Sequence, residues 1–596
     1  MVVIYFLAIL GFGAFFGRYT KTTKDFFLAG QKFSWWLIAT SCVASLVGSY
    51  SFVKYSEMSF KHGFSGTYGY LNDWFWMPFW ILGWLPIIYF TRTTSVPEYF
   101  ERRFGRDARA AATVIILLYM IGYISINLVT MATALDPLLG WGKFNLAVIV
   151  AVICAIYVTA GGQTSVIMTD LAQGFLLLIA GVAILFLGVA YVGGWQSFWN
   201  ALPGSFKHAL PNFAADPNFS TAGVFWQDGM ANSAAFWFMN QGIILRFLSA
   251  KSVEDGRKAA TATLLVLMPL AAIAVCDAGW IGRAMVNLNL GQIPADVDPR
   301  QIFVVVTERI CRPGVFGLVL AALTAALMST IDTLINAVSA VTVNDLYRPY
   351  LARNRSDRHY LAAARWISLA AAGLGVALYP VFNQKSLYVA HGAFTAAITP
   401  PMVVAIVLGM AWRRYNRWGV LATLIGGALA IFASFARPGL LSPFRIGAVG
   451  DEYIRAYYGL VVCLVLGVAA SLLSRRPEPQ RLAGYVWGPQ RALMRMFKGS
   501  EPNLAKGEVA ACTTQLDEQL AEGTVRAPAS AMRTMQARPG DLVLVSRPGW
   551  WHGGVLAAHA RLGEPLPDGE PMRIPRDVLA QLSIPEGRTA HVEKIF

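Results

Sequence analysis

Long apolar runs recur along the chain from its N-terminus to about residue 474. Most are long enough to cross the ~30 Å hydrocarbon core of a bilayer as a helix, and they are too long for the strands of a membrane barrel. Because only helices and closed barrels satisfy their backbone polar groups in lipid, the pattern predicts an all-α polytopic bundle. The expected spans, about thirteen, are 2–17, 34–54, 71–91, 110–135, 144–160, 165–193, 231–249, 259–284, 313–343, 362–384, 389–411, 418–435 and 456–474.

The loops between these runs differ in charge. Alternate loops are rich in Arg and Lys and the others are poorer, although 285–312 carries some. The positive-inside rule therefore predicts an external N-terminus, a cytoplasmic C-terminus and a location in the plasma or inner membrane. The first run lacks a basic segment before it and a small-residue cleavage site after it, so we expect a retained helix rather than a signal peptide. The basic loops contain Arg18, Lys21 and Lys24; Arg102, Arg103, Arg106 and Arg109; Lys251, Arg257 and Lys258; Arg348, Arg353, Arg355 and Arg358; Arg413, Arg414 and Arg417; and Arg475 and Arg476.

Composition agrees with this picture. The chain is 56% hydrophobic and 14% charged, whereas a soluble domain carries about 25% charged residues. A net charge of +15 could suggest a nucleic-acid partner, but the basic residues lie in short loops at helix ends, so we expect none. The six cysteines form no C-x-x-C motif and are expected to be buried thiols.

The chain changes character after Arg476. Residues 477–596 contain no further membrane-length run. We expect a short amphipathic helix at 507–523 and strands at 541–546, 571–575 and 589–596, hence a small, partly β cytoplasmic domain. Trp550, Trp551 and His552 could suggest a ligand site, but an aromatic hairpin tip is the simpler interpretation.

The second span contains a run of small and hydroxyl residues from Ala44 to Ser51. Such a run weakens a continuous helix, and transporters use broken helices whose freed carbonyls coordinate a cation. The alternative is a close helix-packing face built from small residues. This segment alone does not separate the two.

The span 313–343 carries Ala326, Ser329 and Thr330 at spacing i, i+3 and i+4, which places them on one helical face. Two hydroxyls beside the carbonyls of a broken helix would give about five hard oxygen ligands, suited to sodium by analogy with calcium and magnesium. Hydroxyls in membrane helices also bond back to the i−4 carbonyl, and that alternative stays open.

Ionisable residues within apolar runs are costly and are therefore candidates for function. Asp170, Asp277 and Asp332 lie inside such runs, and Asp73, Lys54 and His391 lie near predicted outer ends, where they could reach water instead. Lys54 and Glu57 are three residues apart and could pair with each other.

Five segments together resemble the sodium/solute symporter family, which includes the sodium-coupled sugar, proline, pantothenate and iodide carriers. They occur in the expected order and at the expected spacing over roughly residues 25–475. The segments are DFFLAGQKFSWW at 25–36, SVPEYFERRFG at 95–105, YVTAGGQTSVIMTDLAQ at 157–173, FWFMNQGIILRFLSAKS at 236–252 and MSTIDTLINAVSAVTVNDLY at 328–347.

The resemblance implies a fold of the leucine-transporter type, with two five-helix inverted repeats. These would occupy 34–193 and 231–411, and the sequence itself does not display their symmetry. The remaining segments would be an N-terminal helix and cytoplasmic loop (1–33), an external loop (194–230), two additional helices (412–476) and the cytoplasmic domain (477–596).

The resemblance also implies a sodium site. Its ligands would be the carbonyls of Ala44, Val47 and Ala326 and the hydroxyls of Ser329 and Thr330. Asp170 matches a family aspartate linked to ion passage or a second cation, and we expect Asp332 to belong to the same pathway.

The residues expected to line the solute pocket match the family's patterns less completely. The resemblance places it beside Ser49, Tyr50, Ser51, Asp73, Trp74, Asn240 and Gln241. Sugar carriers have a glutamine where Ser51 stands and a lysine at about Leu265, whereas proline carriers have an aspartate where Leu46 stands. Neither pattern is complete, so the solute stays open.

We therefore expect a symporter that is not an enzyme and imports a small organic solute with sodium by alternating access. Its partners would be sodium, the solute, the bilayer and a possible cytoplasmic protein bound to the tail. The alternatives are a sensor that signals through the tail, and proton coupling through Asp170 and Asp332. A membrane enzyme or channel is disfavoured, because the chain shows neither a His/Asp/Cys cluster nor a repeated pore ring.

Overall fold

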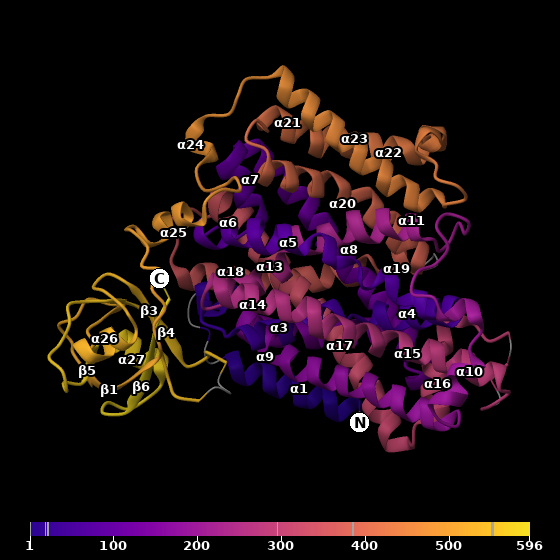
Figure 1. Ribbon diagram of the computed structural model, residues 1–596, viewed down its shortest axis with the longest axis horizontal. Coiled ribbons are helices and arrows are strands. Elements are labelled where there is room, and N and C mark those ends of the chain that lie inside the picture. Colours follow the sequence, from indigo (N-terminus) through magenta and orange to yellow (C-terminus); the bar gives the residue numbers. More distant parts are fainter. Residues whose placement is uncertain are drawn as a thin grey trace.

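A bundle of helices and a separate β-sheet domain make up the molecule. The computed structural model describes residues 2–17, 20, 23–291, 293–294, 296–383, 387–549 and 553–595. The helices run roughly side by side across Figure 1, and the sheet domain, in yellow, lies beyond one of their ends. Arg18, Lys21 and Trp550–His552 lie outside the described residues.

Long apolar helices dominate the bundle. In the described part of the chain, eight are long and apolar enough to cross a membrane, or nine if one bent pair is counted as a span. The spans expected at 34–54, 71–91 and 231–249 correspond to broken helices, and those expected at 144–160 and 165–193 lie on either side of a kink in α9. The main helices are α1 (Val2–Phe16), α8 (Arg106–Leu139), α9 (Lys143–Tyr191), α14 (Val253–Ala262), α15 (Met268–Asn287), α17 (Pro313–Val341), α18 (Asp357–Ala377), α20 (Leu387–Ala411), α21 (Arg417–Leu421), α22 (Gly427–Ala436) and α23 (Asp451–Leu473).

The spans expected at 144–160 and 165–193 meet at a kink in α9. Gly162 has φ +52° and ψ −140°, outside the helical region. A Cβ there would lie 2.4 Å from the carbonyl oxygen of Phe26, which belongs to α2 (Thr23–Leu28). Only glycine tolerates this backbone and this approach, so the kink at Gly162 separates two helical segments, in agreement with the spans expected at 144–160 and 165–193.

Two helices are interrupted. α3 (Trp35–Leu46) and α4 (Ser49–His62) are separated at Val47–Gly48, and the pair is bent by 65°. α12 (Ala234–Phe238) and α13 (Gln241–Leu248) are separated at Met239–Asn240. The first interruption confirms the predicted break and frees the last carbonyls of α3 from their intrahelical bonds.

The C-terminal domain is a six-stranded sheet in the order β2-β4-β3-β6-β1-β5. The helix expected at 507–523 is wrong, because Ala510–Leu516 forms β1 and alternates buried and exposed side chains. The strands expected near 541, 571 and 589 are confirmed. The strands are β1 (Ala510–Leu516), β2 (Thr524–Val525), β3 (Leu542–Ser546), β4 (Ala557–Leu562), β5 (Met572–Ile574) and β6 (Thr589–Lys594), with the helices α26 (Ala529–Thr534) and α27 (Arg576–Leu582).

The sheet domain contacts the bundle at two segments. The Ser34 N–H, at the start of α3, donates to the Gly553 carbonyl at 2.9 Å. Lys251, which follows α13, pairs with Glu593 of β6 at 2.5 Å. The domain therefore touches the beginning of one broken helix and the end of the other.

Candidate functional site

Hydroxyls of α17 meet the carbonyls that the break in α3 sets free. The Ser329 Oγ donates to the Ala44 carbonyl at 2.7 Å and lies 3.1 Å from the Ala326 carbonyl. The Thr330 Oγ1 lies 3.3 Å from the Ser45 carbonyl and 3.4 Å from that of Ala326. These residues are all buried: Ala44, Ser45, Ala326, Ser329 and Thr330. The structure thus brings together four of the five predicted sodium ligands, and their contacts with one another in the described part of the chain are between hydroxyl and carbonyl oxygens.

Val47 is the fifth predicted ligand. It lies in the break, with φ −91° and ψ 78°, and its N–H donates to the Val43 carbonyl at 3.0 Å. Among the described contacts, the Val47 carbonyl reaches neither hydroxyl, and the carbonyl of Ser45 contacts Thr330 instead.

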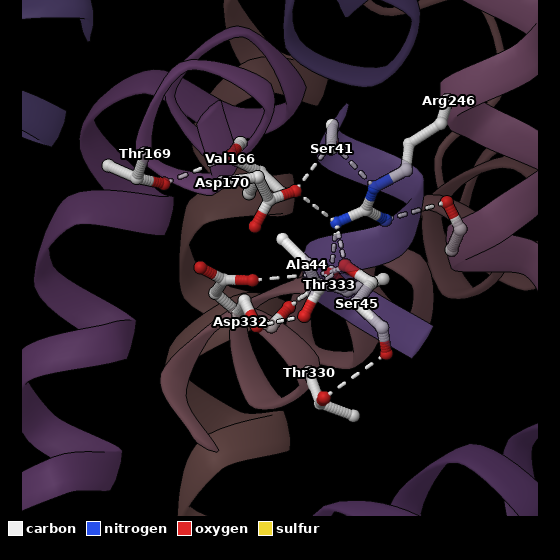
Figure 2. A network of polar contacts seen from close by, with 12 residues as sticks. Ser41, Ala44, Ser45, Val166, Thr169, Asp170, Arg246, Thr330, Asp332 and Thr333 are labelled. Atoms are coloured by element: carbon white, nitrogen blue, oxygen red, sulfur yellow. Dashed lines mark hydrogen bonds and ion pairs between the residues drawn. The ribbon is translucent and has the colours of Figure 1, made fainter. Parts of the chain in front are cut away.

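A buried ionic network lies beside these oxygens (Figure 2). Arg246 of α13 is buried, and its Nη2 lies 2.5 Å from Asp170 Oδ2 and 2.5 Å from Ser45 Oγ. Its Nε donates to Ser41 Oγ at 2.8 Å, and Ser41 in turn lies 2.6 Å from Asp170 Oδ2. Asp170, on α9, is thus tied to α3 and α13 at once.

Asp332 belongs to the same network from the other side. It accepts hydrogen bonds from Tyr157 of α9 and, at 3.2 Å, from the Thr333 hydroxyl. Thr333 also bonds to Arg246 and lies 3.1 Å from Ser45 Oγ. The two predicted pathway carboxylates therefore share one guanidinium, Asp170 directly and Asp332 through Thr333.

Arg246 belongs to this network but is not among the residues predicted from the sequence. It lies inside the apolar run FWFMNQGIILRFL at 236–248, so it is an ionisable residue at membrane depth. The cost argument that singles out Asp170, Asp277 and Asp332 applies equally to this guanidinium.

The predicted solute residues are less closely grouped. The side chains of Ser49 and Tyr50 lie outside the described residues, as does that of His391. Ser51 is buried on α4, whereas Trp74 is 60% exposed.

Asp73, Asn240 and Gln241 each have a partner within the protein. Asp73 accepts a hydrogen bond from the Ser233 hydroxyl at 2.5 Å. The Asn240 Oδ1 caps α13 by accepting from the Gly242 N–H, and Gln241 bonds to the backbone of Thr94 and Val96. Asn240 and Gln241 therefore hold the second helix break in place.

The remaining ionisable candidates also have partners. Lys54 pairs with Asp228 at 3.7 Å, and Glu57 pairs with Lys61 at 2.5 Å. Asp277 is buried in α15 and accepts from the Ala278 N–H.

Two broken helices that meet near the middle of a helical bundle, around hard oxygens and a buried ionic network, are the arrangement of secondary transporters. The fold and the site thus define a multi-pass membrane transporter. The sequence model of the sodium:solute symporter family matches residues 26–427, more than half of the chain. The chain belongs to that family, and sodium is its coupling ion.

Characterised relatives are cotransporters. A sodium/glucose cotransporter of Vibrio parahaemolyticus is 24% identical over 468 residues, which are 72% of this chain and 84% of the relative. A sodium/myo-inositol cotransporter 2 of Oryctolagus cuniculus is 26% identical and covers 89% of this chain and 84% of its own length. The family resemblance inferred from the sequence is thereby confirmed.

Solved structures share the fold. A Na+-coupled sialic acid symporter in a substrate-bound outward-open state superposes with a TM-score of 0.71 at 20% identity, over 80% of this chain and 97% of the other. The nucleobase-cation symporter Mhp1 in a closed conformation gives 0.52 at 13% identity, over 79% and 98%. The leucine-transporter-type core is thus shown for the helical part of the chain.

Proposed function

We propose that this protein imports a small organic solute together with sodium by alternating access, and that sodium binds between α3 and α17. The observation that carries the proposal is the 2.7 Å approach of the Ser329 hydroxyl to the Ala44 carbonyl across the helix break. The site would consist of the Ala44, Val47 and Ala326 carbonyls and the Ser329 and Thr330 hydroxyls.

Neutral oxygens suit a monovalent ion that must leave again. Hard cations prefer carbonyl and hydroxyl oxygens, and a site without a carboxylate does not hold the ion by full charge attraction. With sodium bound, Ser329 Oγ would present a lone pair to the ion, and its hydrogen would turn toward the Ala326 carbonyl, 3.1 Å away. Ligands from two helices make the ion a link between them.

That link supplies the coupling. We assign α3 to the first repeat (34–193) and α17 to the second (231–411), and each repeat would begin with a broken helix. Sodium would hold the two together in the outward-facing state, and its release would let the bundle rock inward. The membrane potential contributes about 2.3 kcal/mol per charge per 100 mV.

The ionic network would form the release path of sodium. Two carboxylates, Asp170 and Asp332, face one guanidinium, Arg246, so full ionisation leaves one negative charge unbalanced. A cation passing from the Ser329 site would be attracted to this surplus. A proton could balance it too, which is why proton coupling is the alternative to test.

The solute would lie on the outer side of the break, against Ser49, Tyr50, Ser51 and Asp73. Trp74 would lie at its rim, and Asn240 and Gln241 would shape the pocket by fixing the opposite break. The relatives named above carry glucose and myo-inositol, so these two compounds belong in a first panel of solutes.

The test is thermal unfolding of the purified protein with a solute panel, in sodium or choline at fixed pH. Sodium at about 100 times its Kd should stabilise the protein by about 2.7 kcal/mol. We expect Ser329→Ala/Thr330→Ala to abolish this sodium-dependent gain. Thr324→Ala is the matched control, because Thr324 is a buried hydroxyl on the same helix that bonds only to the Leu320 carbonyl among the described contacts.

The outcomes separate the hypotheses. A solute that stabilises the protein only in sodium, and not in the double variant, would support the coupled site. A gain that is equal in choline and unaffected by the double variant would contradict it and favour proton coupling. The sensor alternative predicts solute binding without sodium-driven uptake into proteoliposomes.

A further inference from the structure

An open cavity of about 610 Å³ lies where several helix ends meet, away from the sodium site. It is formed by the corner between α7 (Val96–Phe104) and α8, the start of α21, and the segment from Arg475 to α24 (Pro479–Leu482). The membrane spans of α8 and α21–α22 begin here, and that of α23 ends here. The cavity is therefore at the level of the lipid headgroups, and the positive-inside rule assigns this end to the cytoplasm.

Arginine dominates the lining of this cavity. Three of its arginines have an acidic neighbour: Arg417 pairs with Asp107, Arg106 lies 3.8 Å from Glu101, and Arg481 lies 3.7 Å from Glu478. The other three have no carboxylate within ion-pair distance among the described residues, and they leave a surplus of positive charge. They are Arg103, Arg475 and Arg476.

Arg103 is buried at this corner. One guanidinium nitrogen donates to the Tyr415 carbonyl at 2.9 Å, but Nε and Nη1 have no hydrogen-bond partner in the described part of the chain. Burial lowers the pKa of this guanidinium. Buried donors without partners are costly, so an anion nearby would be stabilising.

The start of α8 favours an anion as well. Its N-cap residue, Gly105, has φ +113° and supplies no side-chain cap. Gly105, Arg106 and Asp107, at the start of this 34-residue helix, line the cavity, so the first N–H groups and the helix dipole would favour an anion there. A Cβ on Gly105 would lie only 3.4 Å from Arg481 Nη1.

We propose that this cavity binds the phosphate of an anionic phospholipid headgroup from the cytoplasmic leaflet. A phosphate would accept hydrogen bonds from Arg475, Arg476 and the start of α8 and would offset the charge of Arg103. Basic pockets between membrane helices on this side recognise such headgroups.

The apolar rim favours a lipid over a soluble phosphate. Trp418, 60% exposed, lines the cavity, and Leu472 and Leu473, 52% and 90% exposed, lie at the end of α23, just before the lining residue Arg475. These exposed apolar side chains, close in sequence to Arg417, Arg475 and Arg476, offer a surface for acyl chains. A free phosphate shares the headgroup chemistry but would leave this surface unused.

The test uses the full-length protein in detergent, with phosphatidylglycerol and phosphatidylcholine added in competition and bound lipid measured by native mass spectrometry. We expect phosphatidylglycerol to be retained preferentially. Arg475→Gln/Arg476→Gln should weaken this binding by about thirtyfold. Both arginines are exposed, so the double variant should fold.

Arg355→Gln/Arg358→Gln is the matched control, because it removes the same charge from exposed arginines of another basic loop outside the cavity. This variant should keep the preference. Equal binding of the two lipids, or an equal loss in both double variants, would overturn the proposal. Stabilisation of the protein by inorganic phosphate as strong as that by phosphatidylglycerol would overturn the assignment to a lipid.

Discussion

At the residue scale, Arg246 determines whether the buried network is stable. Its guanidinium makes hydrogen bonds to Asp170, Ser41, Ser45 and Thr333 and is shielded from water. Removing one partner of a buried ion pair leaves the other charge uncompensated, which costs far more than the pair itself contributes. The network is thus sensitive to single substitutions and tolerant of paired ones.

We therefore expect Arg246→Met to lower the free energy of unfolding by about 3–5 kcal/mol. Asp170→Asn added to it should recover part of the loss, because the orphaned carboxylate is then neutral. Thermal unfolding of Arg246→Met, Asp170→Asn and the double variant in detergent gives the coupling free energy between Arg246 and Asp170. Arg445→Gln is the control, since its pair with Asp451 is exposed and should contribute at most about 1 kcal/mol. Additive losses from Arg246→Met and Asp170→Asn would contradict direct pairing.

At the scale of elements, the break between α3 and α4 depends on the space left at Gly48. A Cβ there would lie 3.0 Å from Thr330 Oγ1 and 3.4 Å from Asn127 Oδ1. The backbone of Gly48, at φ −80° and ψ 174°, suits any residue, so a substitution acts by displacing Thr330 rather than by straining the chain. The break thus positions the ligands on both sides of the proposed sodium site.

Gly48→Ala should accordingly weaken sodium binding by about tenfold, which corresponds to about 1.4 kcal/mol, and should change sodium-free stability little. The sodium dependence of the unfolding temperature measures this. Gly373→Ala in α18 is the control, because a Cβ there meets nothing within 4 Å. If both variants bind sodium like the parent chain, Thr330 is not a ligand.

The features predicted correctly from the sequence are those whose signal is local. The small residues around Gly48 predicted the break, and the spacing of Ser329 and Thr330 predicted the face that meets it. Prediction from the sequence failed where the outcome depends on distant contacts. The segment expected to form a helix at 507–523 contains the strand β1 instead, because β5 and β6 flank it. Arg246 could be recognised as costly, but its partners come from three other helices.

At the scale of the whole molecule, the sheet domain and the proposed sodium site act on the same helix. The domain accepts a hydrogen bond from Ser34 at the start of α3, and Ala44 near the end of α3 faces Ser329. The domain also holds Lys251, just beyond α13, through Glu593. Rocking of the bundle would move both attached segments, so inward opening should require the domain to loosen. Because coupling between two sites is reciprocal, sodium binding should tighten the domain on α3.

This coupling predicts that the hydrogen-exchange rate of the Ser34 N–H depends on sodium. The Ser34 N–H, bonded to the Gly553 carbonyl, should exchange more slowly in sodium than in choline, and Glu593→Ala should speed its exchange by removing the partly buried Lys251 pair. Lys506→Ala is the control at the same interface, since its pair with Glu254 is exposed and contributes little. Exchange measured by mass spectrometry on peptides covering residues 31–37 reports the effect. If sodium leaves this exchange unchanged while it still stabilises the protein, the domain is docked independently of the transport cycle. If Glu593→Ala and Lys506→Ala behave alike, the Lys251 contact does not hold the domain in place.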